Sequence, residues 1–76
     1  MNIQENVVNL IARVLEVTPE KINEDTAIGD IPSWDSLRHV TIIIELEKHF
    51  KVNFEPEIIM NMEDVSDIVA AIEERI

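Results

Sequence analysis

A serine, Ser36, stands where a turn-rich loop meets an apolar helical segment predicted over residues 37–50. A hydroxyl at such a junction is exposed, and it faces the free N–H groups and the positive end of the helix dipole. This environment suits a covalently attached phosphate, so Ser36 is a candidate modification site. The simpler alternative is a helix cap, which contributes about 1 kcal/mol to stability. Asp35, just before the serine, is well placed to stabilise the helix dipole.

His39 follows Ser36 by three positions, a spacing that could set a nucleophile beside a base on one helix. No carboxylate is clearly placed to orient the imidazole, and His39 falls on the core face of the predicted helix. We therefore expect a half-buried packing residue rather than part of a hydrolase site. Residues 23–30 lack the acid and the glycine that a calcium loop needs at its fifth and sixth positions. No catalytic residue and no resident metal site are predicted.

The size and composition of the chain argue against an enzyme acting alone. A chain of 76 residues buries only roughly 60% of its unfolded surface, too little for a large dry active site beside its own core. We expect residues 1–76 to form one domain. The absence of cysteine excludes disulfides, thiolate nucleophiles and zinc–thiolate sites.

The net charge and the hydropathy limit the partners. A formal charge of −10 disfavours nucleic acid and anionic membranes, which are polyanions themselves. No segment approaches the ~20 apolar residues that span a bilayer, and the start of the chain lacks the basic region of a signal peptide. A cytoplasmic monomer without membrane insertion is expected.

Hydrophobic periodicity predicts three main helices and one short one. The first covers residues 3–15, the second runs to residue 50, a short third helix opens at Pro56, and the last begins near residue 64. The last helix is expected to carry five apolar residues on one face: Val65, Ile68, Val69, Ile72 and Ile76. The predicted fold is an all-α four-helix bundle with a long loop between the first and second helices.

The long loop before Ser36 is acidic but not wholly polar. A helical turn is expected at residues 18–20, and Ile22, Ile28 and Ile31 are expected to hold the loop against the core. The acidic residues concentrate in residues 16–35 and 51–76, whereas residues 36–50 are neutral overall. A loop of this length in a compact domain is usually functional.

The second helix is apolar on more than one side. Four residues share its predicted core face with His39: Ile42, Ile43, Leu46 and Phe50. Leu37, Val40 and Ile44 fall on a different side. Either the fold wraps further round this helix, or these three residues form a small docking patch beside Ser36.

Taken together, these features resemble an acyl carrier protein of the phosphopantetheine-dependent family. The matching residues are Asp35-Ser36-Leu37 at a helix start, then Val40, Leu46, Glu47 and Phe50, and the segment 64–69 at the start of the last helix. The resemblance implies that phosphopantetheine from coenzyme A is esterified to Ser36 and carries acyl groups as thioesters on its thiol. It also implies that Asp35 helps to hold Mg²⁺ during the modification only.

The same resemblance implies a carrier that catalyses nothing itself. Its partners would be a phosphopantetheinyl transferase, an acyl-loading ligase or acyltransferase, and downstream synthases. Five residues of the second helix are the expected docking contacts: Leu37, Val40, Thr41, Ile44 and Glu47. Asp30 and Asp35 would add charge complementarity.

The second helix departs from the acidic pattern of carriers in fatty-acid synthesis. Arg38 and His39 follow Leu37, and Thr41 and Lys48 stand where acids are typical. Trp34, expected to pack the loop onto the helix as a hydrophobic plug, is also more similar to carriers of specialised pathways. We favour a carrier for polyketide-like, other secondary or lipid synthesis. Alternatives are an aminoacyl, D-alanyl or peptidyl carrier, or an unmodified helical interaction module.

Overall fold

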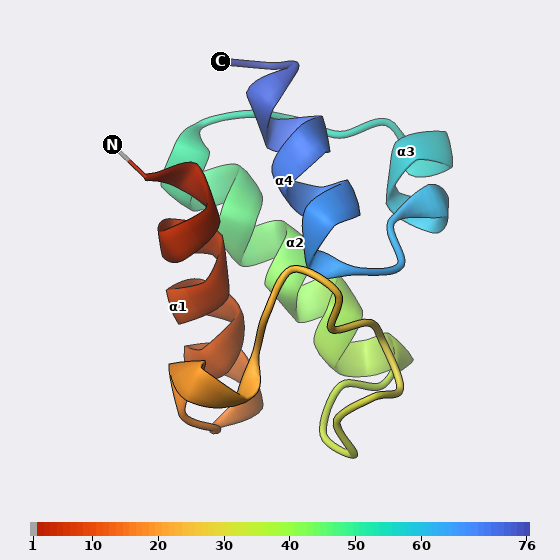
Figure 1. The fold of residues 1–76 in the computed structure, drawn as a ribbon. Helices are drawn as coiled ribbons and strands as arrows, with labels where there is room; N and C mark the ends of the chain where they lie inside the picture. Colours follow the sequence, from red (N-terminus) through yellow and green to blue (C-terminus); the bar gives the residue numbers. More distant parts are fainter. Residues whose placement is uncertain (1) are drawn as a thin grey trace.

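The computed structural model describes residues 2–76 as four α-helices and one short 3₁₀ turn (Figure 1). The elements are α1 (Ile3–Leu15), the turn η1 (Pro19–Lys21), α2 (Ser36–Phe50), α3 (Pro56–Asn61) and α4 (Val65–Glu73). Within residues 2–76 the only β-type pairings are isolated bridges. The predicted all-α bundle, with one short helix and a long loop after the first, is confirmed.

Helices α1, α2 and α4 enclose the core, and α3 lies beside them (Figure 1). Eight fully buried aliphatic side chains come from these three helices: Val7, Ile11, Ile42, Ile43, Leu46, Val65, Ile68 and Ile72. Each helix therefore buries one stripe and leaves the other side in water, as its periodicity predicts. The burial of these stripes is the main stabilising term of a domain this small.

Two helices end in a way that the sequence does not signal. Glu16 after α1 and Lys51 after α2 adopt left-handed backbone conformations, with φ of 59° and 56°. The next residue then donates its N–H back across the last turn, from Val17 to Ala12 O at 3.0 Å and from Val52 to Glu47 O at 3.1 Å. Such a bond satisfies a backbone carbonyl that has no partner at the helix end. The left-handed residue, here Glu16 or Lys51, is usually a glycine in this arrangement.

The long loop is fastened to the start of α4. Val65 N–H donates to Thr26 O at 3.0 Å, and Ile28 N–H donates to Glu63 O at 2.9 Å. Ile22 is buried, and Ile28 and Ile31 pack against the core at partial exposure. The expected hydrophobic anchors are confirmed, and the backbone hydrogen bonds add a second fastening that no sequence pattern indicates.

The start of α4 is capped by a close relative of the capping box. Asp64 accepts a hydrogen bond from Asp67 N–H at 2.8 Å, and the Asp67 carboxylate accepts one from Glu63 N–H at 3.1 Å. The backbone bond from Asp67 and the hydroxyl of Ser66 lower the pKa of Asp64. The predicted helix start is confirmed, with the reciprocal bond one residue earlier than the usual pattern.

The C-terminal end corrects one expectation and adds a contact that no sequence pattern indicates. Helix α4 ends at Glu73, so Ile76 lies outside it and is 62% exposed rather than on the core face. Arg75 follows the helix and has a side chain only 18% exposed. Its guanidinium donates to Asn53 O at 3.1 Å, pairs with Glu55 at 3.0 Å and lies 5.1 Å from the ring centroid of Phe54. Arg75 thus ties the end of α4 to the α2–α3 connection.

No helix within residues 2–76 combines the length and the apolar character needed to cross a bilayer.

We expect Arg75→Ala to lower the free energy of unfolding by about 1–3 kcal/mol, because it removes hydrogen bonds from a charged donor and the contact with Phe54. Urea denaturation followed by circular dichroism measures this. Lys21→Ala, at an exposed position, is the control and should change stability by less than ~0.5 kcal/mol. Equal effects of the two substitutions would show that the Arg75 contacts contribute nothing.

Candidate functional site

Ser36 is the first residue of α2, and Asp35 is the residue that caps the helix. The Asp35 carboxylate accepts a hydrogen bond from Arg38 N–H at 2.9 Å, and its backbone is extended, with φ of −105° and ψ of −174°. The capping role that the sequence allows for Ser36 therefore falls to its neighbour. This leaves the serine hydroxyl without a structural task at the helix start.

The hydroxyl of Ser36 differs from those of the other two serines in the chain. Ser33 donates to Leu15 O at 3.2 Å, and Ser66 donates to Asp64 at 2.9 Å. No side-chain hydrogen bond within residues 2–76 involves the Ser36 hydroxyl, and the residue is exposed. Ser36 is therefore the one serine that offers an accessible and uncommitted oxygen.

Trp34 closes the loop immediately before this site. Its side chain is 1% exposed, as expected for a hydrophobic plug. Its backbone N–H donates to Ile31 O at 2.9 Å, and its carbonyl accepts from Gly29 N–H at 3.0 Å. Gly29 has a φ of 92°, a conformation that residues with a side chain rarely adopt. The tight turn of residues 29–34 thus positions the Trp34 side chain in the core.

The indole of Trp34 donates a hydrogen bond from Nε1 to Nδ1 of His39 at 3.1 Å. The two rings stack with centroids 6.1 Å apart and an interplanar angle of 26°. His39 is only 8% exposed, so it is more deeply buried than the half-buried packing residue expected. The bond joins the end of the loop to the first turn of α2.

The environment of His39 excludes the dyad with Ser36. Because Nδ1 accepts from Trp34, the neutral imidazole carries its proton on Nε2. Nε2 is buried and has no hydrogen-bond partner within residues 2–76. Desolvation by burial lowers the pKa of His39 from its ordinary value of 6.5, which keeps the ring neutral. Neither nitrogen is available as a base for the serine.

An exposed apolar surface follows Ser36 along α2. Leu37 is 80% exposed, Val40 is 53% exposed and Ile44 is 46% exposed, so the fold does not wrap round this side. We call these three residues the α2 patch. Thr41 is exposed beside the patch. Its hydroxyl donates a hydrogen bond to Leu37 O at 3.2 Å, so the hydroxyl proton is bonded to the backbone of α2 itself.

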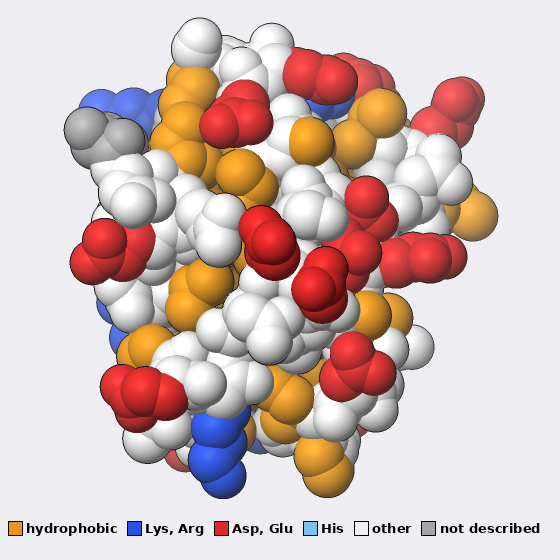
Figure 2. Space-filling model, viewed as in Figure 1, with side chains coloured by type: hydrophobic (Ala, Val, Ile, Leu, Met, Phe, Trp, Pro, Cys, Tyr) orange, Lys and Arg blue, Asp and Glu red, His pale blue; other side chains and the backbone are white. Residues whose placement is uncertain are grey.

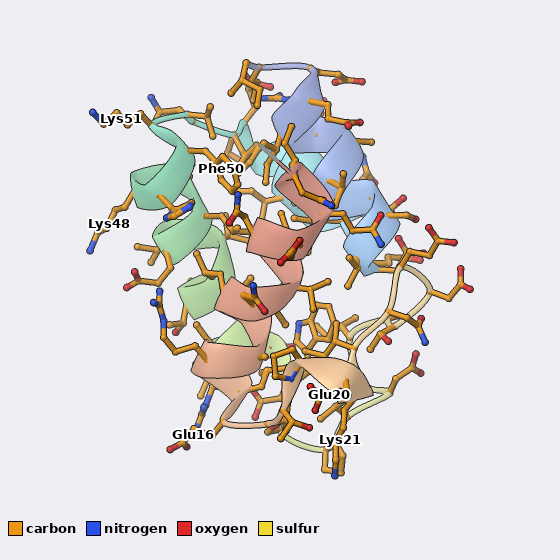
Figure 3. All side chains as sticks on the ribbon, turned by 60° about the vertical axis from the view of Figure 1, so that its left-hand side comes forward. Glu16, Glu20, Lys21, Lys48, Phe50 and Lys51 are labelled. Atoms are coloured by element: carbon orange, nitrogen blue, oxygen red, sulfur yellow. The ribbon has the colours of Figure 1, made fainter. Side chains whose placement is uncertain are left out.

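Glu47 lies one turn beyond Ile44 on the same side of α2. Glu47 is partly buried, and its carboxylate accepts a hydrogen bond from Phe54 N–H at 2.9 Å. It therefore holds the α2–α3 connection, about three turns beyond Ser36. Lys48 and Lys51 project into solvent at this end of the helix (Figure 3). Asp30 is exposed in the loop, where its carboxylate accepts from Ala27 N–H at 2.9 Å.

Arg38 is a site residue whose role sequence reasoning missed. Its guanidinium donates to Val14 O and lies 3.8 Å from the carboxylate of Glu16, which ties the last turn of α1 to the first turn of α2. The half-exposed pair with Glu16 contributes little by itself. The carbonyl bond fixes where α2 begins, and only the fold brings Val14 and Arg38 together.

The charge of the molecule is unevenly placed. Acidic side chains gather over α4, α3 and the loop on the face shown in Figure 2. On α2 the exposed charges after the patch are basic, at Lys48 and at Lys51 just beyond its end. The approach to the α2 patch therefore has a different electrostatic character from the rest of the surface.

The site suits an acceptor of a chemical group rather than a catalyst. An exposed hydroxyl lies at the positive end of α2, and neither ring nitrogen of the nearby histidine is free to activate it. Among residues 2–76 no three His, Cys, Asp or Glu side chains are grouped closely enough to hold a metal ion. The activating base and most of any metal coordination would have to come from a second protein.

Comparison with known proteins supports this interpretation. Residues 5–72 match the family described as "Phosphopantetheine attachment site". The acyl carrier protein homolog of Mycoplasmopsis pulmonis is 32% identical over 66 residues, which cover 87% of this chain and 89% of that protein. The solution structure of the holo acyl carrier protein from Geobacter metallireducens superimposes with a TM-score of 0.87 at 24% identity, covering 99% of this chain and 86% of that one. This structural match concerns the fold.

The lowered pKa of His39 predicts a loss of stability in mild acid. The unfolded chain takes up a proton on this ring as the pH falls below 6.5, whereas the folded protein resists protonation until its lower pKa is reached. Stability is therefore complete above 6.5 and declines as the pH falls from there towards the folded pKa.

Urea denaturation at a series of pH values tests this. The decline should be shallower in His39→Asn, which keeps an acceptor near the Nδ1 position but does not titrate. His49→Asn makes the same change at the other, exposed histidine and should follow the wild type. Identical pH slopes for the wild type and His39→Asn would refute the assignment.

Proposed function

Since this chain belongs to the family of acyl carrier proteins that contain the phosphopantetheine attachment site, we propose that Ser36 is the residue that bears the phosphopantetheine arm. The observation that carries this proposal is the exposed hydroxyl at the first position of α2, which makes no hydrogen bond within residues 2–76. The other two serines use their hydroxyls inside the fold. The helix dipole and the open N–H groups of the first turn favour a phosphodiester at this position.

The residues around Ser36 fit this group. Asp35 is exposed and uses one carboxylate oxygen to cap α2, and no side-chain hydrogen bond within residues 2–76 involves the other oxygen. That oxygen is a hard ligand of the kind that Mg²⁺ prefers. A single carboxylate cannot hold the ion alone, so Asp35 would share Mg²⁺ with coenzyme A and the transferase during attachment only.

The chain itself supplies no sulfur nucleophile, because it contains no cysteine. When attached, phosphopantetheine supplies the thiol on which acyl groups are held as thioesters. The fold supplies a rigid base for the arm at the start of α2, which is fixed by Trp34, Asp35 and Arg38. Partner enzymes then carry out the chemistry on the bound acyl group.

The α2 patch is proposed as the contact for these enzymes, first of all for the phosphopantetheinyl transferase. Its three side chains are exposed and begin at the residue next to Ser36. A partner that covers them would bring its active site to the serine. Thr41 lies at the edge of this contact, whereas Glu47 supports the fold of the α2–α3 connection.

A specialised biosynthetic pathway is proposed over general fatty-acid synthesis. The support lies on α2, where Thr41 and Lys48 are exposed and Glu47 is held by Phe54 N–H. An enzyme that recognises acidic carriers would find little of its expected charge on this side. Loading of the holo protein by a malonyl transferase of fatty-acid synthesis, at the rate of that pathway's own carrier, would contradict this preference.

Incubation of the apo protein with coenzyme A, Mg²⁺ and a broad-specificity phosphopantetheinyl transferase should add the mass of one phosphopantetheine. Ser36→Ala should abolish the gain, since it removes the acceptor oxygen. Ser33→Ala and Ser66→Ala are matched controls and should retain it. Intact-mass spectrometry is the readout. Absence of any gain in the wild type, under conditions that modify a known carrier, would refute the proposed function.

Leu37→Ala and Ile44→Ala should each lower kcat/KM for this modification by about fivefold or more, as expected for apolar anchors in an interface. Because both side chains are exposed, thermal stability should stay nearly unchanged. Ile76→Ala, an exposed aliphatic position outside α4, is the control for the rate.

The buried Ile43 provides the opposite comparison, since Ile43→Ala should cost about 2–5 kcal/mol of stability. A comparable loss in Leu37→Ala or Ile44→Ala would show that the patch is part of the core. Unchanged kinetics in both patch variants would remove it from the docking surface.

A further inference from the structure

The loop before α2 is joined to the helix on either side of Ser36. On the loop side, the backbone of Trp34 is held by hydrogen bonds with Gly29 and Ile31. On the helix side, the Trp34 indole reaches His39 Nδ1 at 3.1 Å. Asp35 and Ser36 therefore lie within a short bridge whose two ends are both buried.

The use of a buried histidine in this bridge lowers the stability of the fold. A buried donor without a partner destabilises the folded state, and His39 Nε2 is such a donor within residues 2–76. A leucine at position 39 would fill the same core face without the unpaired N–H group. A buried group of this kind in a native fold calls for an explanation beyond packing.

We propose that the hydrogen bond between Trp34 and His39 is a positioning contact that presents Ser36 to the enzyme attaching the phosphopantetheine arm. Both residues act through the backbone of the first turn of α2 and touch neither coenzyme A nor the reacting atoms. The proposal rests on the proposed function of Ser36.

Three side-chain contacts hold this turn: the bond from Trp34 to His39, the cap formed by Asp35, and the bond from Arg38 to Val14 O. Of the three, the bond from Trp34 is the one that joins the loop before Asp35 to α2. Asp35 and Leu37 are exposed on either side of the serine, and the cap formed by Asp35 is local to the helix. Without the indole bond the loop end is held to α2 only by the chain and by the packing of the buried tryptophan, so we expect the hydroxyl of Ser36 to be placed less precisely. Small displacements of a reacting atom reduce a group-transfer rate strongly.

The bond also makes this presentation sensitive to acid. Protonation of Nδ1 turns the acceptor into a donor, so the indole N–H loses its partner. Burial lowers the pKa of His39, so this change takes place below its ordinary value of 6.5.

Charged groups on the surrounding elements are engaged elsewhere. Arg38 on α2 bonds Val14 O and pairs with Glu16 of α1, and Asp35 bonds Arg38 N–H. Asp30 in the loop bonds Ala27 N–H, and Asp64 before α4 bonds Asp67 N–H and Ser66.

The test measures kcat/KM of the apo protein with coenzyme A, Mg²⁺ and a broad-specificity phosphopantetheinyl transferase. His39→Leu and Trp34→Phe remove the acceptor and the donor respectively, and each should lower kcat/KM about threefold to tenfold, the factor that one neutral hydrogen bond supplies. His39→Asn retains an acceptor and should restore most of the rate. His49→Asn is the matched control and should behave as the wild type.

The pH profile separates positioning from mere stability. Rates are divided by those of a control carrier in the same mixture, which removes the pH dependence of the transferase. The wild-type ratio should fall as the pH approaches the pKa of His39 in the folded protein, which burial holds below 6.5, while the His39→Asn ratio stays level. The chain has one tryptophan, so a single indole N–H resonance should report the bond directly by shifting over the same pH range.

Two outcomes overturn the proposal. One is a folded His39→Leu or Trp34→Phe protein that is modified at the wild-type rate at neutral pH. The other is an indole resonance that does not respond when His39 titrates. Failure of the wild type itself to gain phosphopantetheine is a different result, because it rejects the function proposed for Ser36 rather than the positioning contact.

Discussion

Helix α2 has to bury one side completely while Ser36 and Leu37 at its start stay in water, and the rest of the structure follows from this constraint. Ile42, Ile43 and Leu46 fill the core against the other helices, and Leu37 beside Ser36 is 80% exposed. A helix start in water would fray if it were held only by its own hydrogen bonds. The loop is therefore fastened to it by the bond from Trp34 to His39, and α1 is fastened to it through Arg38.

These contacts assign the capping of α2 and the presentation of a free hydroxyl to two different residues. Asp35 satisfies the helix N-terminus, and Trp34 seals the core beneath the loop, so the hydroxyl of Ser36 is left uncommitted. The same division continues along α2. The near end presents apolar side chains, and at the far end Glu47 holds the chain that leads into α3. A carrier needs such a division, because its attachment residue must be fixed in place and still accessible.

Much of the fold could be predicted from periodicity and local chemistry. The helix of residues 3–15, the short helix opening at Pro56 and the capped start of α4 follow from patterns that span only a few residues. The angular positions of Leu37, Val40 and Ile44 place them away from the core face of the helix, but whether another element covers that side is decided by the fold, which leaves them exposed. What escaped prediction depends on residues far apart in the sequence. Arg75 reaches Asn53, and Arg38 reaches Val14, which no local pattern indicates.

The proposed function depends on the oxygen of Ser36, and the most direct measurement locates the modification itself. Trypsin releases residues 22–38 as one peptide that contains both Ser33 and Ser36. Fragmentation of this peptide from the transferase-treated protein should place phosphopantetheine on Ser36 and leave Ser33 unmodified. Phosphopantetheine on Ser33, or an unmodified peptide from a protein that has gained its mass elsewhere, would contradict the account.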